Sequence, residues 1–254
     1  MHTLKTVVIA IVLGLVYFGI VMGVAMGLVS FNANATPTWV WFPIPNTVLI
    51  IIATAYAQKR LGIGLVPTKP VTRNRMYLIG GALTILGMAA CAVQGKFSGY
   101  VRATELLDYD VSALFQISYA LYMPVFAAVL AEVTFRGVMQ TRMQRVLGVW
   151  PLVITIAVVN VFAHRWGPEI TQNGIGLFVI LAGWTYLRWL SGSLWPPLIL
   201  HAVLNFIMAI GLWTRGPLVH AEASTSVITS VGVMGLLALA LSVMLVRGWE
   251  FGKK

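Results

Sequence analysis

The sequence predicts an all-α polytopic membrane protein, a bundle of about eight transmembrane helices. Hydrophobic residues make up 59% of the chain and charged residues only 9%, against about 25% charged residues in soluble domains. The mean hydropathy is +0.89. The apolar residues come in runs of about 20, the length that a helix needs to cross the hydrocarbon core. A single membrane domain over residues 1–254 accounts for the whole chain and leaves no soluble domain over.

Each predicted helix is an apolar run bounded by a polar or basic loop. The first run follows Lys5 and is longer than the apolar part of a signal peptide, about 7–15 residues. We therefore expect a retained span, although Ala33-Asn34-Ala35 looks like a cleavage site. The basic loop 59–75 separates the second run from the third, and the polar loop 96–111, expected as a loop or a short interfacial helix, precedes the fourth. The predicted helices cover about residues 6–29, 38–58, 76–95, 112–138, 148–164, 174–190, 194–214 and 224–246.

The distribution of charge predicts the topology. The formal charge is +10, yet the cations lie in short loops and not on a basic face of a soluble fold, so nucleic acid is not an expected partner. With the N-terminus inside, twelve of the 17 Lys and Arg residues face the cytoplasm, as the positive-inside rule describes. We expect an integral protein of a prokaryotic plasma membrane, surrounded by lipid, with both termini cytoplasmic. The twelve are Lys5, Lys59, Arg60, Lys69, Arg73, Arg75, Arg142, Arg145, Arg188, Arg247, Lys253 and Lys254.

Ionisable groups at membrane depth are costly and usually pair or do chemistry. Glu132 and Arg136 lie four residues apart, on one face of the fourth helix. Alone, they fit a self-neutralising ion pair that fixes helix packing, since an arginine with satisfied donors positions other groups well and catalyses poorly. The single cysteine, Cys91, lies in an apolar run, so neither an intrachain disulfide nor a cysteine zinc site is expected.

Two histidines and an asparagine add further polar groups. His201 and Asn205 share a face of the seventh helix. Imidazole can bind a metal or transfer a proton near neutral pH, and a carboxamide can donate to an oxyanion. An interhelical hydrogen bond is the equally weighted alternative. His164 ends the fifth run and, alone, fits an interfacial histidine beside an aromatic belt.

Depth along the helices limits which groups can meet. At 1.5 Å per residue, Glu132 lies about 15 Å from Arg142, whereas His164 lies about 22 Å from Val149. The fifth run is only marginally long enough to span. His164 can therefore reach the other groups only if its helix tilts or is partly re-entrant.

The ordered set of polar residues carries a resemblance to a known family. Phe135-Arg136-Gly137 follows the acid, and Trp195-Pro196-Pro197 precedes the His–Asn pair. Over about residues 120–210 the sequence resembles the CAAX-protease and bacteriocin-processing family of intramembrane proteases, also called the type II CAAX prenyl protease or abortive-infection family. Its markers are Glu-Glu-x-x-x-Arg, Phe-x-x-x-His and His-x-x-x-Asn. The resemblance maps the second glutamate, the arginine, the first histidine and the last pair onto Glu132, Arg136, His164, His201 and Asn205.

Two positions depart from the family pattern. Ala131 stands where the doublet has its first glutamate, and Asn160 stands where the phenylalanine precedes His164 by four. The resemblance implies that the first glutamate activates the attacking water, and alanine has no proton acceptor. Three interpretations are open: Glu132 has taken over this role, the protein is a natural pseudoprotease, or Ala131 is an engineered inactivating substitution.

The resemblance implies an intramembrane endopeptidase that cleaves a peptide or prenylated peptide at the membrane. In the mechanism that we expect, a glutamate and His164 hold the water, His201 and Asn205 stabilise the oxyanion, and Glu132–Arg136 orients the fourth helix. A metalloprotease is also open, because His164, His201 and a carboxylate can bind a divalent metal such as zinc. A metal-free glutamate mechanism is equally tenable.

Two functions without proteolysis are also open. Ala131 favours a non-catalytic immunity or scaffold protein on the same fold. The polar cluster also suits the substrate or proton path of a transporter. Against a transporter, the sequence has no inverted repeat and no matching pair of helices broken by Gly or Pro.

Overall fold

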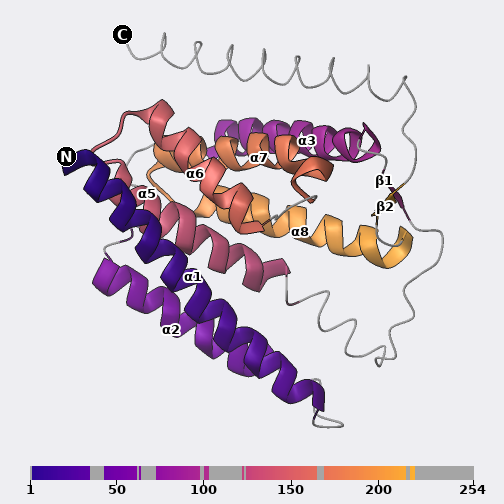
Figure 1. Cartoon of the computed structure of the whole chain (residues 1–254), viewed down its shortest axis with the longest axis horizontal. Coiled ribbons are helices and arrows are strands. Elements are labelled where there is room, and N and C mark those ends of the chain that lie inside the picture. The colour runs from indigo at the N-terminus through magenta and orange to yellow at the C-terminus, as the bar shows by residue number, and fades with distance from the viewer. Residues whose placement is uncertain are drawn as a thin grey trace.

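Seven helices make up the described part of the chain (Figure 1). The computed structural model describes residues 2–34, 43–61, 63, 73–97, 100–102, 122, 124–164, 169–215 and 218–220. The helix over 124–143, which we call the fourth helix, has three parts: an α-helix over 124–131, a π-helix, η2 (Glu132–Met139), and a last α-helical turn, α5 (Gln140–Met143). The other six are α1 (His2–Asn34), α2 (Pro43–Leu61), α3 (Arg73–Phe97), α6 (Val149–His164), α7 (Glu169–Ser191) and α8 (Trp195–Arg215).

These helices follow the apolar runs of the sequence. The predicted fifth helix, 148–164, is α6 to within one residue, and the predicted sixth helix, 174–190, lies inside α7. The predicted run 224–246 lies outside the described residues, as does the beginning of the predicted run 112–138. An eighth helix therefore stays a prediction.

Two short strands were not predicted. β1 (Tyr100–Arg102) pairs antiparallel with β2 (Leu218–His220), and β1 lies in the region 96–111 where we expected a loop or an interfacial helix. The cause is tertiary. β1 follows α3 and β2 follows α8, and these two helices pack together, so the segments that leave them meet at one end of the bundle (Figure 1).

The seven helices alternate in direction, and their basic ends lie together. In Figure 1 the N-terminus, the turn between α5 and α6 and the turn between α7 and α8 all lie on the left, and the two strands lie on the right. Exposed tryptophans, Trp150 and Trp195, begin α6 and α8 at the left end, as interfacial aromatic residues often do. The cations on helix ends or turns at this side include Lys5, Lys59, Arg60, Arg142, Arg145 and Arg188.

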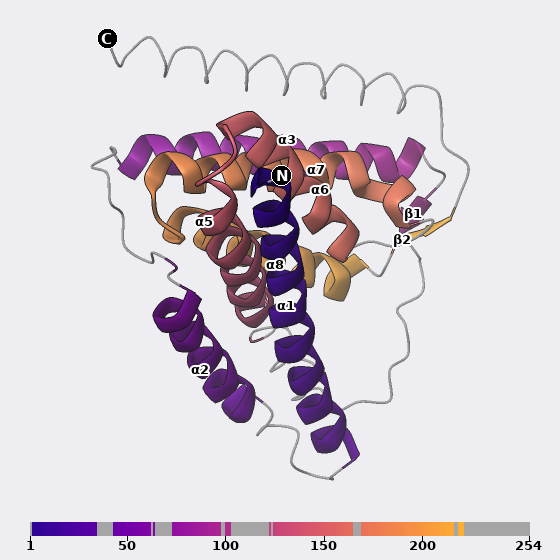
Figure 2. The same ribbon diagram turned by 60° about the vertical axis from the view of Figure 1, so that its left-hand side comes forward.

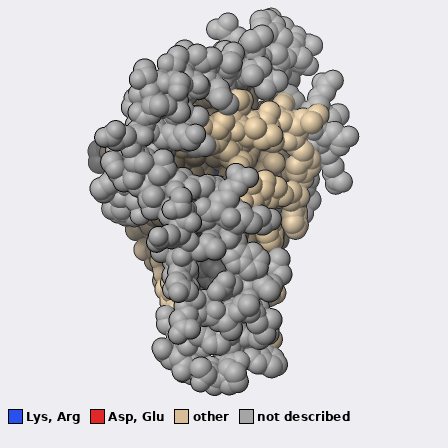
Figure 3. Space-filling view, turned by 90° about the vertical axis from the view of Figure 1, so that its right-hand side faces the viewer, with Lys and Arg blue, Asp and Glu red and all other residues tan. Residues whose placement is uncertain are grey.

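The outer surface of the helices is apolar. Ile20 is 63% exposed, Leu78 is 72% exposed and Ile175 is 70% exposed. On the face seen in Figure 3, the described surface contains neither Lys or Arg nor Asp or Glu. Water disfavours such a surface and lipid does not.

Two helices among the described residues are long and apolar enough to cross a membrane. They are His2–Leu28 within α1 and Asn173–Ser191 within α7, with mean hydropathies of 2.8 and 1.3. Shorter apolar helices cover Tyr77–Cys91, Val149–His164 and Trp195–Met208. The predicted membrane helix bundle is supported by these helices, whereas the number of eight spans is not confirmed.

Glycines let α3 and α7 approach closely. A Cβ on Gly176 would meet the backbone nitrogen of Cys91 and would lie 2.7 Å from the carbonyl oxygen of Gly87. A Cβ on Gly87 would meet Ile180. Small residues at such crossings are the usual means of packing membrane helices, because lipid supplies no hydrophobic drive between them. Figure 2 shows α3 and α7 side by side, while α1 and α2 project away from them.

The π-helical segment lies at the centre of the bundle. The backbone N–H of Gln140 donates to the carbonyl oxygen of Phe135, five residues earlier, so each turn contains more than the 3.6 residues of an α-helix. All eight residues of η2 are buried. On one side η2 packs against α1, where Gly14 makes room for Met139. The segment therefore presents its polar residues to the protein interior.

Candidate active site

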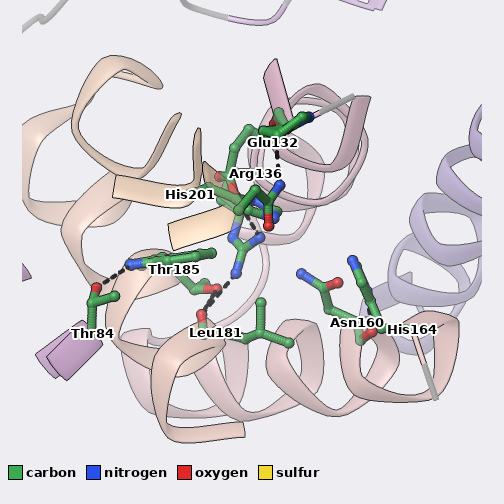
Figure 4. Close-up of polar contacts among 11 residues, drawn as sticks. Thr84, Glu132, Arg136, Asn160, His164, Leu181, Thr185 and His201 are labelled. Carbon is green, nitrogen blue, oxygen red and sulfur yellow. Dashed lines mark hydrogen bonds and ion pairs between the residues drawn. The ribbon is translucent and has the colours of Figure 1, made fainter. Parts of the chain in front are cut away.

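The site begins with an ion pair on η2. The Nη1 atom of Arg136 lies 3.0 Å from Oε1 of Glu132, and both side chains are almost fully buried. Charges that leave water must be paired, because the cost of burying a single charge is several kcal/mol. The predicted ion pair is present in the structure, and it lies inside the bundle between the fourth helix, α7 and α8 (Figure 4).

Arg136 joins the fourth helix to α7. Its Nη2 atom donates to the carbonyl oxygen of Leu181 at 2.9 Å, and its guanidinium carbon lies 5.8 Å from the centre of the Trp184 ring. One turn further along, Gln140 donates to the carbonyl oxygen of Thr185 at 3.0 Å. These contacts hold the fourth helix in a fixed rotation, and so they fix the direction of the Glu132 carboxylate.

His201 meets the same carboxylate from α8. Its Nδ1 atom lies 2.8 Å from Oε1 of Glu132, and the imidazole is buried. The Trp184 ring lies 4.6 Å from the imidazole, centre to centre. Trp184 is in turn held by a hydrogen bond from its indole N–H to Oγ1 of Thr84 on α3, at 2.9 Å. Four helices thus determine the position of His201.

His164 approaches from α6. Its ring centre lies 6.4 Å from that of His201 and 6.0 Å from that of Phe135. From the sequence, we expected His164 to reach the other groups only if its helix tilts or is partly re-entrant. In the structure α6 runs obliquely across α7 (Figure 1). The last residue of α6 thereby reaches a histidine that is only six residues into α8.

The two histidines share one hydrogen-bonding pattern. Nδ1 of His164 contacts the carbonyl oxygen of Asn160 at 2.9 Å, and Nδ1 of His201 contacts the Glu132 carboxylate. Both partners accept hydrogen bonds, so Nδ1 must carry the proton in each ring. In a neutral imidazole the lone pair then lies on Nε2, which is the atom able to take a proton.

Two other predicted site residues have different surroundings. Asn205 donates from Nδ2 to the carbonyl oxygen of Pro124 at 3.1 Å, which ties α8 to the start of the fourth helix. Ala131 is 2% exposed and belongs to an apolar cluster with Phe135, Met139 and Ala10. The structure therefore brings Glu132, Arg136, His164 and His201 together. It gives the Asn205 amide a backbone partner, and it surrounds Ala131 with apolar side chains.

Sequence reasoning gave no site role to several residues at this site. Trp184 and Thr185 on α7 and Thr84 on α3 are all buried and hydrogen-bonded. Gln140 follows Arg136 by four residues, as Arg136 follows Glu132, and this spacing could have indicated that Gln140 shares their helix face. Asn160 was named only as a departure from a motif, yet it is fully buried beside His164 (Figure 4).

A metal site was tested on the same residues. A catalytic zinc needs about three protein ligands, and among the described residues there is no group of three or more His, Cys, Asp or Glu that could hold a metal ion. Oε1 of Glu132 contacts both Arg136 and His201. The donors described at His164 and His201 therefore do not fit a three-ligand zinc site.

The candidate site lies in a segment that matches a known protein family. Residues 113–207 match the family model described as type II CAAX prenyl endopeptidase Rce1-like. This part of the chain is an Rce1-like domain. The predicted resemblance is thereby confirmed, over less than half of the chain, and the matched segment contains the positions of Ala131, Glu132, Arg136, His164, His201 and Asn205. Neither the curated proteins nor the solved structures contained a match to the chain.

Members of the Rce1-like family are integral membrane proteins, in agreement with the apolar outer surface. The family description names an endopeptidase, an enzyme that cleaves peptides. The activity and the substrate of this chain do not follow from the match.

Proposed function

We propose that this protein is an intramembrane endopeptidase that hydrolyses a peptide or prenylated peptide at the membrane surface. The observation that carries the proposal is the meeting of Glu132, Arg136 and His201 around one buried carboxylate oxygen, with His164 close by. These residues come from three helices that are far apart in sequence. A structural ion pair would need only Glu132 and Arg136.

His201 is the proposed general base. Its Nδ1–H is held by Glu132, which fixes the ring and stabilises the imidazolium that forms when Nε2 takes a proton, as the acid does in other acid–histidine pairs. Oε1 of Glu132 accepts hydrogen bonds from both Arg136 and His201, and these two contacts hold the carboxylate in place. Glu132 is therefore assigned to orienting His201, and Arg136 to orienting Glu132.

The reaction then needs one water and one peptide bond. Nε2 of His201 takes a proton from the water while the water oxygen bonds to the carbonyl carbon, and the π electrons move onto the carbonyl oxygen. When the tetrahedral intermediate collapses, the C–N bond breaks and the leaving nitrogen receives the proton from His201. The products are a carboxylic acid and an amine. His164 lies near enough to His201 to orient the water.

Ala131 supports a second candidate, a non-catalytic immunity or scaffold protein. The alanine packs with apolar side chains, and its methyl group cannot accept a proton.

The deciding experiment uses the full chain in vesicles with a farnesylated peptide, and product is measured by mass spectrometry. Wild-type protein and Ala131→Glu are compared, each with and without His201→Ala. His220→Ala is the matched control, because His220 lies in β2 away from the site. We expect cleavage by at least one of the two parents, a loss of about 100-fold or more with His201→Ala, and no change with His220→Ala. Folded parents that both release no product would contradict the endopeptidase.

The topology is part of the proposal. The basic ends of the helices lie at one end of the bundle, and the positive-inside rule places that end in the cytoplasm. His201 lies six residues from the start of α8 at this end, which puts it about 9 Å along the helix. A substrate segment that enters from the cytoplasmic surface would have only this short distance to cross.

A further inference from the structure

Asn160 is the most unusual polar residue at the site. Its side chain is fully buried in α6, and neither Nδ2 nor Oδ1 has a protein hydrogen-bond partner. Burying an amide without hydrogen bonds costs about 1–3 kcal/mol. A side chain that carries this cost within an apolar helix needs an explanation that the fold does not supply.

The surroundings of Asn160 indicate what it could bind. It lies one turn before His164, and the two side chains project from α6 toward the helix that carries Glu132 and Arg136 (Figure 4). Oε2 of Glu132 and Nε of Arg136 are also buried without a protein hydrogen-bond partner. Unsatisfied donors and acceptors of this kind gather where water or a polar ligand binds.

The proposed hydrolysis needs a donor for the oxyanion, and sequence reasoning assigned this role to Asn205. In the structure Nδ2 of Asn205 instead donates to the carbonyl oxygen of Pro124. Asn160 offers the same chemical group, a carboxamide, on the helix that carries His164. Its Nδ2 atom has no competing acceptor within the described protein.

We propose that Asn160 is a catalytic residue whose Nδ2–H donates a hydrogen bond to the carbonyl oxygen of the peptide bond that is attacked. The inference rests on the proposed function. The donor strengthens its bond as the carbonyl oxygen gains negative charge, when the water oxygen bonds to the carbon and the π electrons move onto the oxygen. Oδ1 is then the acceptor available for a substrate N–H or for the attacking water.

The test separates binding from cleavage. Binding is measured by calorimetry in micelles for two farnesylated peptide analogues that cannot be hydrolysed. One has a ketomethylene group at the cleavage position and so keeps the carbonyl oxygen, and the other has an ethylene group and lacks it. Wild-type protein is compared with Asn160→Leu. The matched control is Asn46→Leu, because Asn46 is equally buried with both amide atoms unpartnered but lies on α2.

We expect wild-type protein and Asn46→Leu to bind the ketomethylene analogue about tenfold more tightly than the ethylene analogue. Asn160→Leu should bind both equally. In the cleavage assay Asn160→Leu should raise KM up to about tenfold, because the contact with the substrate carbonyl is lost, and should lower kcat about 100-fold, since the hydrogen bond strengthens further in the transition state. The variant should fold, because leucine removes an unsatisfied amide.

The two proposals can fail separately. Discrimination between the analogues by wild-type protein and not by Asn160→Leu, with no cleavage in any variant, would retain the role of Asn160 in binding and reject the endopeptidase. Equal discrimination by wild-type protein and Asn160→Leu would reject the role of Asn160, and so would the absence of binding to either analogue. Cleavage that is unchanged in Asn160→Leu would reject it as well.

Discussion

Neutralising Glu132 should destabilise the protein more than removing the whole ion pair. At 3.0 Å and an effective dielectric constant of about 20, the attraction between Arg136 and Glu132 is about 5.5 kcal/mol. After Glu132→Gln, the fully buried guanidinium keeps the carbonyl oxygen of Leu181 and the face of Trp184, but it has no counter-charge. Breaking a buried pair in this way costs about 3–5 kcal/mol.

The double variant Glu132→Gln with Arg136→Met distinguishes charge from packing. It removes the uncompensated cation and nearly preserves the side-chain volume, so we expect the double variant to have a higher free energy of unfolding than Glu132→Gln alone. Unfolding is measured in micelles by denaturant titration with circular dichroism. Arg142→Met is the control on the same helix, where partial burial at the helix end predicts a change below about 1 kcal/mol. Additive effects of the two single substitutions would refute the reasoning.

Two further substitutions test the packing around the site by the same unfolding assay. Gly176→Ala places a methyl group against the backbone of Cys91 and Gly87, which cannot rotate away. We therefore expect the free energy of unfolding to fall by at least about 1–3 kcal/mol. An unchanged free energy of unfolding would mean that α3 and α7 lie further apart. Trp184→Phe removes the hydrogen bond to Thr84 and part of the buried ring. We expect the free energy of unfolding to fall by about 1–3 kcal/mol and kcat to fall as well. If neither the free energy of unfolding nor kcat changed, the role of Trp184 in positioning His201 would be contradicted.

The sequence was most informative where periodicity and length decide the structure. Apolar runs bounded by cations predicted α6 and α7 closely, because a helix in lipid must satisfy its own backbone and must fit the thickness of the membrane. The strands β1 and β2 could not be predicted in the same way. Their pairing depends on the packing of α3 against α8, which is a contact between distant parts of the chain.

Within the site, spacing predicted faces but not partners. The interval of four residues predicted that Glu132 and Arg136 would meet, and they do. The same interval joined His201 to Asn205, yet Glu132 binds the first and Pro124 the second. The acceptor of Arg136 on α7 is the backbone carbonyl of Leu181, and a backbone acceptor leaves no trace in residue identity. Asn160 was noted in the sequence only because it stands where the family motif has a phenylalanine.

The π-helical segment makes the number of residues part of the geometry at this site. An α-helix would turn each residue by about 100°, whereas the wider coil over Glu132–Met139 turns each by less. Removing one residue there would let the backbone revert to an α-helix and would rotate the preceding residues about the helix axis. A protein that lacks one residue of this segment but keeps Glu132 would direct its carboxylate away from α8. The length of this stretch is therefore as much a requirement of the site as the chemistry it carries.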